Sequence, residues 1–99
     1  MTAKTKKWDA ASALDTPDRI ALYLEEAFED GDPQLISAAI GDVARAHGMT
    51  QLAQETGLTR EALYRSLSDE GNPEFSTVLK VLGALGIRLA PVKDEAEAA

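Results

Sequence analysis

An all-α fold, a compact bundle of about five helices that contains a helix-turn-helix, is expected for this chain on three observations. Apolar residues recur at intervals of three and four, which is the spacing of one buried helical face. Pro17 and Pro33 each follow a residue that can cap a helix. Gly57 separates two short helical segments, as in a helix-turn-helix. A short strand near the C-terminus is the one departure that we expect.

The chain is expected to form one small domain with an extension at each end. We predict a flexible N-terminal arm over residues 1–13, a helix-turn-helix domain over 14–92 and a disordered tail over 93–99. Trp8 is the large apolar group of the arm. Its ring either packs onto the outer surface of this domain or anchors a partner protein, because tryptophan favours interface centres.

The first helix is expected to begin at Pro17, with Asp15 or Thr16 as its cap, and to end at Gly31. Its apolar stripe consists of Ile20, Tyr23, Leu24, Ala27 and Phe28. Four acidic residues form the opposite face: Glu25, Glu26, Glu29 and Asp30. They are either a solvated surface or a contact surface for a basic partner.

The second helix is expected to begin at Pro33, with Asp32 as its cap. Its apolar stripe is Ile36, Ala39, Ile40 and Val43. Gly41 within it suggests close packing against another helix, since glycine costs about 1 kcal/mol relative to alanine. His47 continues the stripe by spacing and is interpreted as a partly buried structural histidine.

Residues 49–67, MTQLAQETGLTREALYRSL, predict two helices joined by a glycine turn. Gly57 lies where the backbone must adopt a positive φ, and Thr59 is a suitable cap for the second helix. Leu63 and Leu67 give that helix its inner face. Its outer face is expected to carry Arg60, Glu61, Tyr64, Arg65 and Ser68.

A turn at SDEGNPEF is expected to precede a last helix, FSTVLKVLGALG. Its apolar face is predicted to contain Phe75, Val78, Leu79, Leu82 and Leu85. Residues 87–92, IRLAPV, alternate as a short strand does. A lone strand leaves its main chain unpaired, so we expect it to pair with a second copy or with the sheet edge of a partner.

The net charge of −7 is divided unevenly along the chain. Residues 1–44 carry four basic and nine acidic side chains, a net −5; residues 45–93 carry six and five, a net +1; residues 94–99 add −3. The predicted helix-turn-helix therefore lies in the part that is not acidic. With so few cations, DNA binding is expected to require dimerisation or a basic partner.

Other classes of function receive little support from the sequence. The chain has no cysteine and a single histidine, and we find no acid pair, phosphate loop or nucleophile with a base, so neither a metal site, a cofactor nor an enzyme is expected. No apolar run reaches the ~18 residues of a membrane span or follows the early lysines as in a signal peptide. We expect a cytoplasmic protein.

From residue 14 to about residue 90 the chain resembles the probable addiction-module antidote proteins, a HigA-like branch of bacterial antitoxins. Its most specific pieces are EDGDP, MTQLAQETGLTREALYRSLS and GNPEFSTVLKVLGALG. The helix-turn-helix is also similar to that of the lambda-repressor-like family, from which residues 75–77 depart slightly. The resemblance implies a compact α-helical protein, commonly dimeric, that binds its own operator and a small basic RelE/HigB/ParE-like toxin.

This implies an antitoxin that represses its own operon, with two recognition helices in major grooves about 34 Å apart. Candidate DNA contacts are Thr50, Gln51, Thr59, Arg60, Glu61, Tyr64, Arg65 and Ser68. Candidate toxin contacts are Trp8, Glu25, Glu26, Glu29, Asp30 and Arg88. Two alternatives remain: a transcription regulator without a toxin partner, and an interaction module that does not bind DNA.

Overall fold

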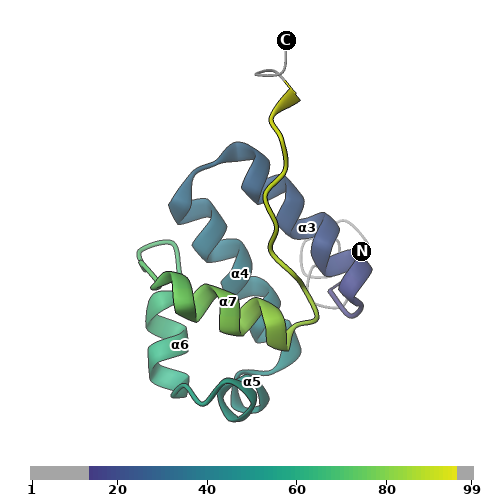
Figure 1. The fold of residues 1–99 in the computed structure, drawn as a ribbon. Helices are drawn as coiled ribbons and strands as arrows, with labels where there is room; N and C mark the ends of the chain where they lie inside the picture. The colour runs from purple at the N-terminus through teal and green to yellow at the C-terminus, as the bar shows by residue number, and fades with distance from the viewer. Residues whose placement is uncertain (1–13, 96–99) are drawn as a thin grey trace, which may run out of the picture.

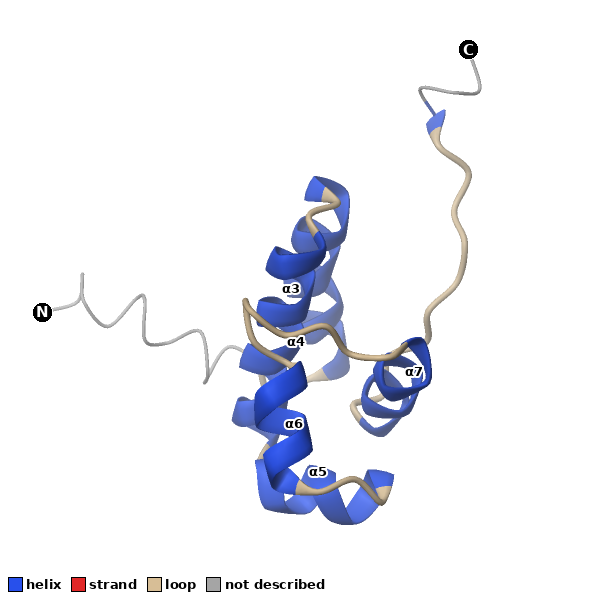
Figure 2. Ribbon diagram, turned by 90° about the vertical axis from the view of Figure 1, so that its left-hand side faces the viewer, coloured by secondary structure: helices blue, strands red, loops and turns tan. Residues whose placement is uncertain are grey.

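The computed structural model describes residues 14–95, which contain five helices and no strand. With the labels of Figure 1, α3 (Pro17–Asp30) and α4 (Pro33–His47) run in roughly opposite directions, and α7 (Phe75–Ala84) passes in front of α4 in this view and packs against α5 (Met49–Thr56). The short helices α5 and α6 (Arg60–Ser66) lie at the far end of the molecule from the upper part of α3 (Figures 1 and 2). The all-α prediction is confirmed. The predicted arm over 1–13, with Trp8, and residues 96–99 of the predicted tail lie outside the described residues.

The first helix begins and ends, and the second helix begins, where the sequence predicts. The Thr16 hydroxyl accepts a hydrogen bond from the Arg19 amide (3.2 Å), and the Asp32 carboxylate accepts one from the Gln34 amide (3.0 Å). These caps satisfy amides that have no partner inside the helix. α3 ends at Gly31 (φ 82°) and α4 ends at Gly48 (φ 114°). Gly31 and Asp32 alone connect α3 to α4, and this short connection holds the two helices against each other.

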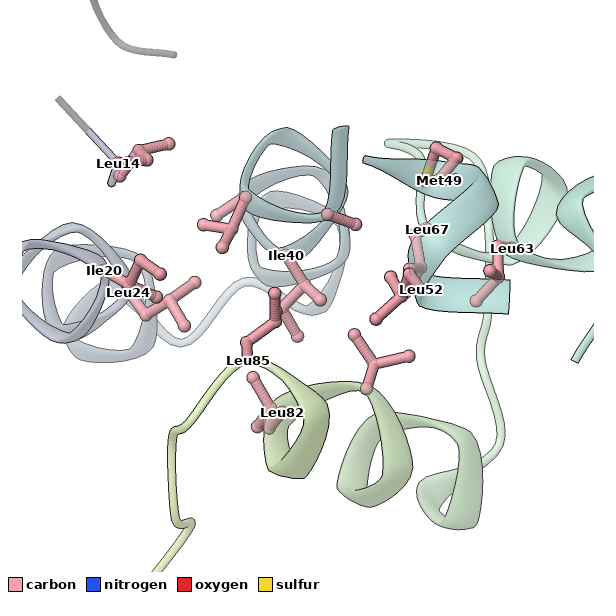
Figure 3. Packing of buried hydrophobic residues seen from close by; sticks show 14 of the residues in the cluster. Leu14, Ile20, Leu24, Ile40, Met49, Leu52, Leu63, Leu67, Leu82 and Leu85 are labelled. Carbon is pink, nitrogen blue, oxygen red and sulfur yellow. The ribbon is translucent and has the colours of Figure 1, made fainter. Parts of the chain in front are cut away.

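The hydrophobic core lies where α4, α5, α6 and α7 meet and extends to α3 on one side (Figure 3). Its most deeply buried large side chains are Ile40, Val43, Leu52, Leu63, Leu67, Val81 and Leu82. Each side chain of this kind contributes about 1.5–3 kcal/mol when fully buried. Leu14, Ile20 and Leu24 close the core at α3.

The predicted apolar face of α7 is wrong in part. Phe75 is 67% exposed and Leu79 is 44% exposed, whereas Val81 is fully buried. The helix packs against α5, and its buried side chains are Val81, Leu82 and the partly buried Val78, so its inner face is rotated from the predicted one. The predicted face and the observed face of α7 both follow the three–four spacing of a helix. The packing against α5 decides which of the two is buried.

The predicted strand at 87–92 does not form in the single chain. The Ile87 amide donates to the Leu82 carbonyl (2.8 Å), after which the segment is irregular up to Pro91 and beyond. No described strand lies beside it, and a strand is defined by the ladder that it makes with a neighbour. Leu89 is partly buried against the core, whereas Val92 is 89% exposed.

Candidate functional site

The turn between α5 and α6 has the order and spacing of the predicted helix-turn-helix. Gly57 ends α5 at φ 79°, and its amide donates to the Ala53 carbonyl (2.9 Å). The Thr56 hydroxyl donates to the Leu52 carbonyl (2.8 Å) and accepts from the Leu58 amide (3.2 Å). The Thr59 hydroxyl accepts from the Ala62 amide (3.0 Å), which caps α6. Local hydrogen bonds thus fix the angle at which α6 leaves the turn.

Two glycines place the C-terminal end of α6. A methyl group on Gly41 of α4 would overlap the Leu67 carbonyl oxygen, so α6 ends against the backbone of α4. This is the close packing that Gly41 predicts. A methyl group on Gly71 would overlap the Ser66 carbonyl oxygen, because the loop that leads to α7 folds back over the same end of α6. With Leu63 and Leu67 fully buried, α6 can present only its opposite face to solvent.

That outer face carries two arginines and a tyrosine. The Arg60 guanidinium lies over the Tyr64 ring, 5.8 Å from its centroid, close enough for a cation–π contact. Arg65 is exposed on the same helix. Neither arginine forms a salt bridge with any described residue. Their positive charges are therefore available to an external anion, and the Tyr64 ring limits the orientations that Arg60 can adopt.

The other predicted DNA contacts differ in whether their side chains already form hydrogen bonds within the chain. Glu61 and Thr50 are exposed, in the first turns of α6 and α5. The Thr59 hydroxyl already serves as a cap. Ser68 lies beyond the end of α6, where its hydroxyl donates to the Arg65 carbonyl (3.3 Å). The prediction that Ser68 lies on this helix is wrong. α6 ends at Ser66, and the chain turns at Leu67, whose side chain is buried.

Gln51 takes part in a hydrogen-bonded group at the base of α5. Its amide donates to Glu55 (3.0 Å), and the His47 imidazole Nε2 lies 3.0 Å from the other oxygen of the same carboxylate. The bond from Gln51, followed by that from His47, lowers the pKa of Glu55. One N–H of the Gln51 amide is thus occupied by Glu55. His47 is partly buried, as predicted.

The acidic face of α3 is solvent-exposed along its length. Glu25, Glu26, Glu29 and Asp30 are all exposed, and none forms a salt bridge with a described residue. Glu26 and Asp30 line a shallow hollow between α3 and α4. Glu25 instead faces the C-terminal part of the chain. The four acids therefore divide between two sides of the helix.

Glu25 and Arg88 line opposite walls of one groove of about 540 Å³ between α3 and the segment after α7. We call it the C-terminal groove; it is lined by Ala21, Leu24, Glu25, Phe28, Leu82, Ile87, Arg88, Leu89, Ala90 and Val92. Phe28 was expected in the buried stripe of α3 but is 37% exposed, because none of the described helices covers the end of that stripe. The groove joins segments far apart in sequence, and residue spacing along the chain could not have revealed it.

Metal and membrane sites have no basis in the described structure. Within residues 14–95, no three histidine, aspartate or glutamate side chains converge as metal ligands would. Among the helices that the structure describes, none is long and apolar enough to cross a membrane.

Comparison with known proteins gives one family. A family model described as "Probable addiction module antidote protein" matches residues 4–93, which include all five helices and the C-terminal groove. A curated relative from Haemophilus influenzae, itself described as an uncharacterized protein, is 44% identical over 88 residues that cover 89% of this chain and 91% of the relative. No solved structure gives a significant match.

Proposed function

Since this chain belongs to the family of probable addiction module antidote proteins, we propose that it is the antitoxin of a type II toxin–antitoxin module. The observation that carries the proposal is the family match over residues 4–93. An antidote acts on a toxin, so the partner is a protein that the chain binds and neutralises. The HigA-like resemblance of the sequence extends the proposal to a small toxin of the RelE/HigB/ParE type.

The exposed acidic residues of α3 support the proposal that the toxin is basic. Its four exposed acids have no cationic partner among the described residues, and residues 1–44 carry a net charge of −5. Complementary charge mainly speeds association and selects the partner, and it does so less as salt is raised. A toxin with a net positive charge would be attracted to this end of the molecule.

The outer face of α6 supports a second activity, repression of the toxin–antitoxin operon. In this proposal α6 enters the major groove of operator DNA, as in lambda-repressor-like proteins, and Arg60, Tyr64 and Arg65 make the main contacts. Two copies would place two α6 helices about 34 Å apart on a palindromic site. The exposed apolar side chains of Phe75 and Leu79, one turn apart on α7, offer an unpartnered face to a second copy.

Co-expression with the neighbouring gene tests the antitoxin proposal. We expect the product of a small neighbouring reading frame to stop growth alone, and this chain to restore growth and to co-purify with that product. Binding to DNA from upstream of the gene pair, measured by fluorescence anisotropy, tests the repressor proposal separately.

An interaction module that does not bind DNA is a second candidate, which the net charge of −7 favours. It predicts rescue of growth without any affinity for the upstream DNA, at low salt and with the toxin present. Specific binding in the nanomolar range would exclude it.

A further inference from the structure

We propose that the C-terminal groove receives a basic, amphipathic segment of the toxin, an inference that rests on the antitoxin function proposed above. Two surfaces of the chain are candidates for the toxin: the acidic face of α3 and the segment over residues 87–92. The structure brings Glu25 of that face together with Ile87, Arg88, Leu89, Ala90 and Val92 in one groove.

The floor of the groove is apolar and open. Leu24, Leu82 and Leu89 line it from the core, and Phe28 and Val92 add side chains that are 37% and 89% exposed. Small monomeric proteins seldom leave a continuous apolar groove uncovered unless a ligand or partner fills it. Glu25, Arg88 and Ala90 in its lining are also exposed, so the groove is accessible from solvent.

The main chain of one wall is exposed and is not paired within the described part of the chain. No main-chain hydrogen bond joins residues 88–92 to any described residue. Exposed amides and carbonyls in an extended segment can pair with a peptide from a partner, with apolar side chains of that peptide filling the space beneath. An apolar docking residue would thus be held by the floor and by the main chain of 88–92.

The charged residues of the groove predict that the docked segment is basic. Glu25 is on the α3 wall, and Glu29 follows one turn later on the same exposed helix surface; neither forms a salt bridge within residues 14–95. A lysine or arginine of the docked segment would lie against these acids. Arg88 on the other wall would face an acidic or carbonyl group, so only one orientation of the segment satisfies both walls.

The same charges disfavour a second copy as the occupant. A second copy would bring Glu25 and Glu29 as well as Arg88 to the same groove, so its acids would outnumber the single arginine that could pair with them. Operator DNA is disfavoured as well, because its phosphates would be repelled. The groove and the outer face of α6 lie at different ends of the molecule (Figure 1), which leaves both available in one complex.

Two variants at exposed positions of the groove test the proposal, with the product of the neighbouring gene as the probe. Glu25→Lys reverses the charge of the α3 wall, and Val92→Asp places a charge on the apolar floor. Glu70→Lys, in the exposed loop before α7, is the matched charge control, and Leu22→Asp, at a 65% exposed site of α3 outside the groove, is the matched apolar control. All four sites are exposed, so the variants are expected to fold.

We expect Glu25→Lys and Val92→Asp each to weaken binding of the probe roughly tenfold or more in calorimetry. The two controls should stay within about threefold of the parent chain, and binding to upstream DNA should not change in either groove variant. If the parent chain binds the probe and the groove variants match their controls, the toxin docks elsewhere and the groove proposal is wrong, while the antitoxin function stands. If the parent chain neither binds the probe nor rescues growth, both proposals are overturned.

Discussion

Arg60 and Arg65 differ from the other arginines of α3–α6 in having no carboxylate partner among the described residues. Arg19 pairs with Asp15, just before α3, and Arg45 pairs with Asp42 on α4. An incoming phosphate or base can therefore bind these two arginines of α6 without first breaking a salt bridge. Sequence spacing predicted which side of the helix they occupy, but not that Arg60 lies over Tyr64.

Arg60→Ala and Arg65→Ala should each weaken binding to upstream DNA with no loss of helicity, because both side chains are exposed. A lost base contact costs about 1–3 kcal/mol, whereas a lost phosphate contact mainly reduces the salt dependence of binding. Fluorescence anisotropy at several salt concentrations distinguishes the two. Arg19→Ala is the control on α3. Unchanged affinity in both α6 variants would show that this face does not contact DNA.

Gly41 and Gly83 form a matched pair of helical glycines. Gly41→Ala should destabilise the protein by about 1–3 kcal/mol or more, since its methyl group would overlap the Leu67 carbonyl. Gly83→Ala meets no atom within 4 Å and should stabilise α7 by up to about 1 kcal/mol. Thermal unfolding followed by circular dichroism measures both. Equal melting temperatures for the two variants would mean that α4 and the end of α6 are not in close contact.

Tyr23 carries a pH-dependent part of the stability. Burial, together with its hydrogen bond to the Asp42 carboxylate (2.6 Å), raises the pKa of Tyr23 from 10.0 to about 12. The folded protein therefore retains the phenol proton more tightly than the unfolded chain does. This contribution is complete below pH 10 and is lost as the pH rises through 12.

The stability advantage of the parent chain over Tyr23→Phe should thus be about 1 kcal/mol near neutral pH and should decrease steadily above pH 10. Urea unfolding of both proteins at a series of alkaline pH values measures it. A difference that is constant across this range would mean that the hydroxyl does not bond to Asp42 in solution.

Among the elements, the turn at Gly57 depends most on one residue. With φ at 79° and no atom within 4 Å of an added Cβ, the cost of substitution comes from the backbone alone. We expect the stability to fall in the order Gly57→Asn, Gly57→Ala, Gly57→Val, the last by about 2 kcal/mol or more. Melting temperatures of the three variants test this order. If valine is tolerated as well as asparagine, the turn does not have this conformation.

The helices could be predicted from the sequence because their limits are set locally. Thr16, Asp32 and Thr59 each cap a helix through an amide two or three residues away, and Gly31 and Gly57 end helices through their own φ angles. The inner face of α7 was not predictable in this way. Phe75 and Val81 are equally apolar, and only the position of α5 decides which of them is buried.

The two candidate binding surfaces also differ in whether they could be predicted from the sequence. The outer face of α6 lies within one helix and could be read from residue spacing. The C-terminal groove requires α3 and residues 87–92 to meet, which depends on the path of the chain through α4 to α7. From the sequence, Glu25 and Arg88 are only separate candidates, and the spacing places Phe28 in the buried stripe because it does not show that this end of α3 faces the groove.

Because the outer face of α6 and the C-terminal groove are formed by different parts of the molecule, we expect DNA binding and toxin binding to be separable. The double variant Arg60→Ala/Arg65→Ala should lose repression of a reporter placed behind the upstream DNA, yet still rescue growth from the toxin. Electrostatic steering by the acidic end should also make toxin association fast and should slow it as salt is raised. If the double variant loses both activities while its circular dichroism is unchanged, the two surfaces overlap.

The shortness of α6 has a consequence for every such measurement. Seven residues make about two turns, too few to remain helical in water without the packing of Leu63 and Leu67. The binding-competent form of α6 therefore exists only in the folded fraction of molecules. The apparent dissociation constant is the intrinsic one divided by that fraction. A variant that is half unfolded would thus lose only about twofold in apparent affinity, whereas a fully folded variant that loses tenfold has lost a contact.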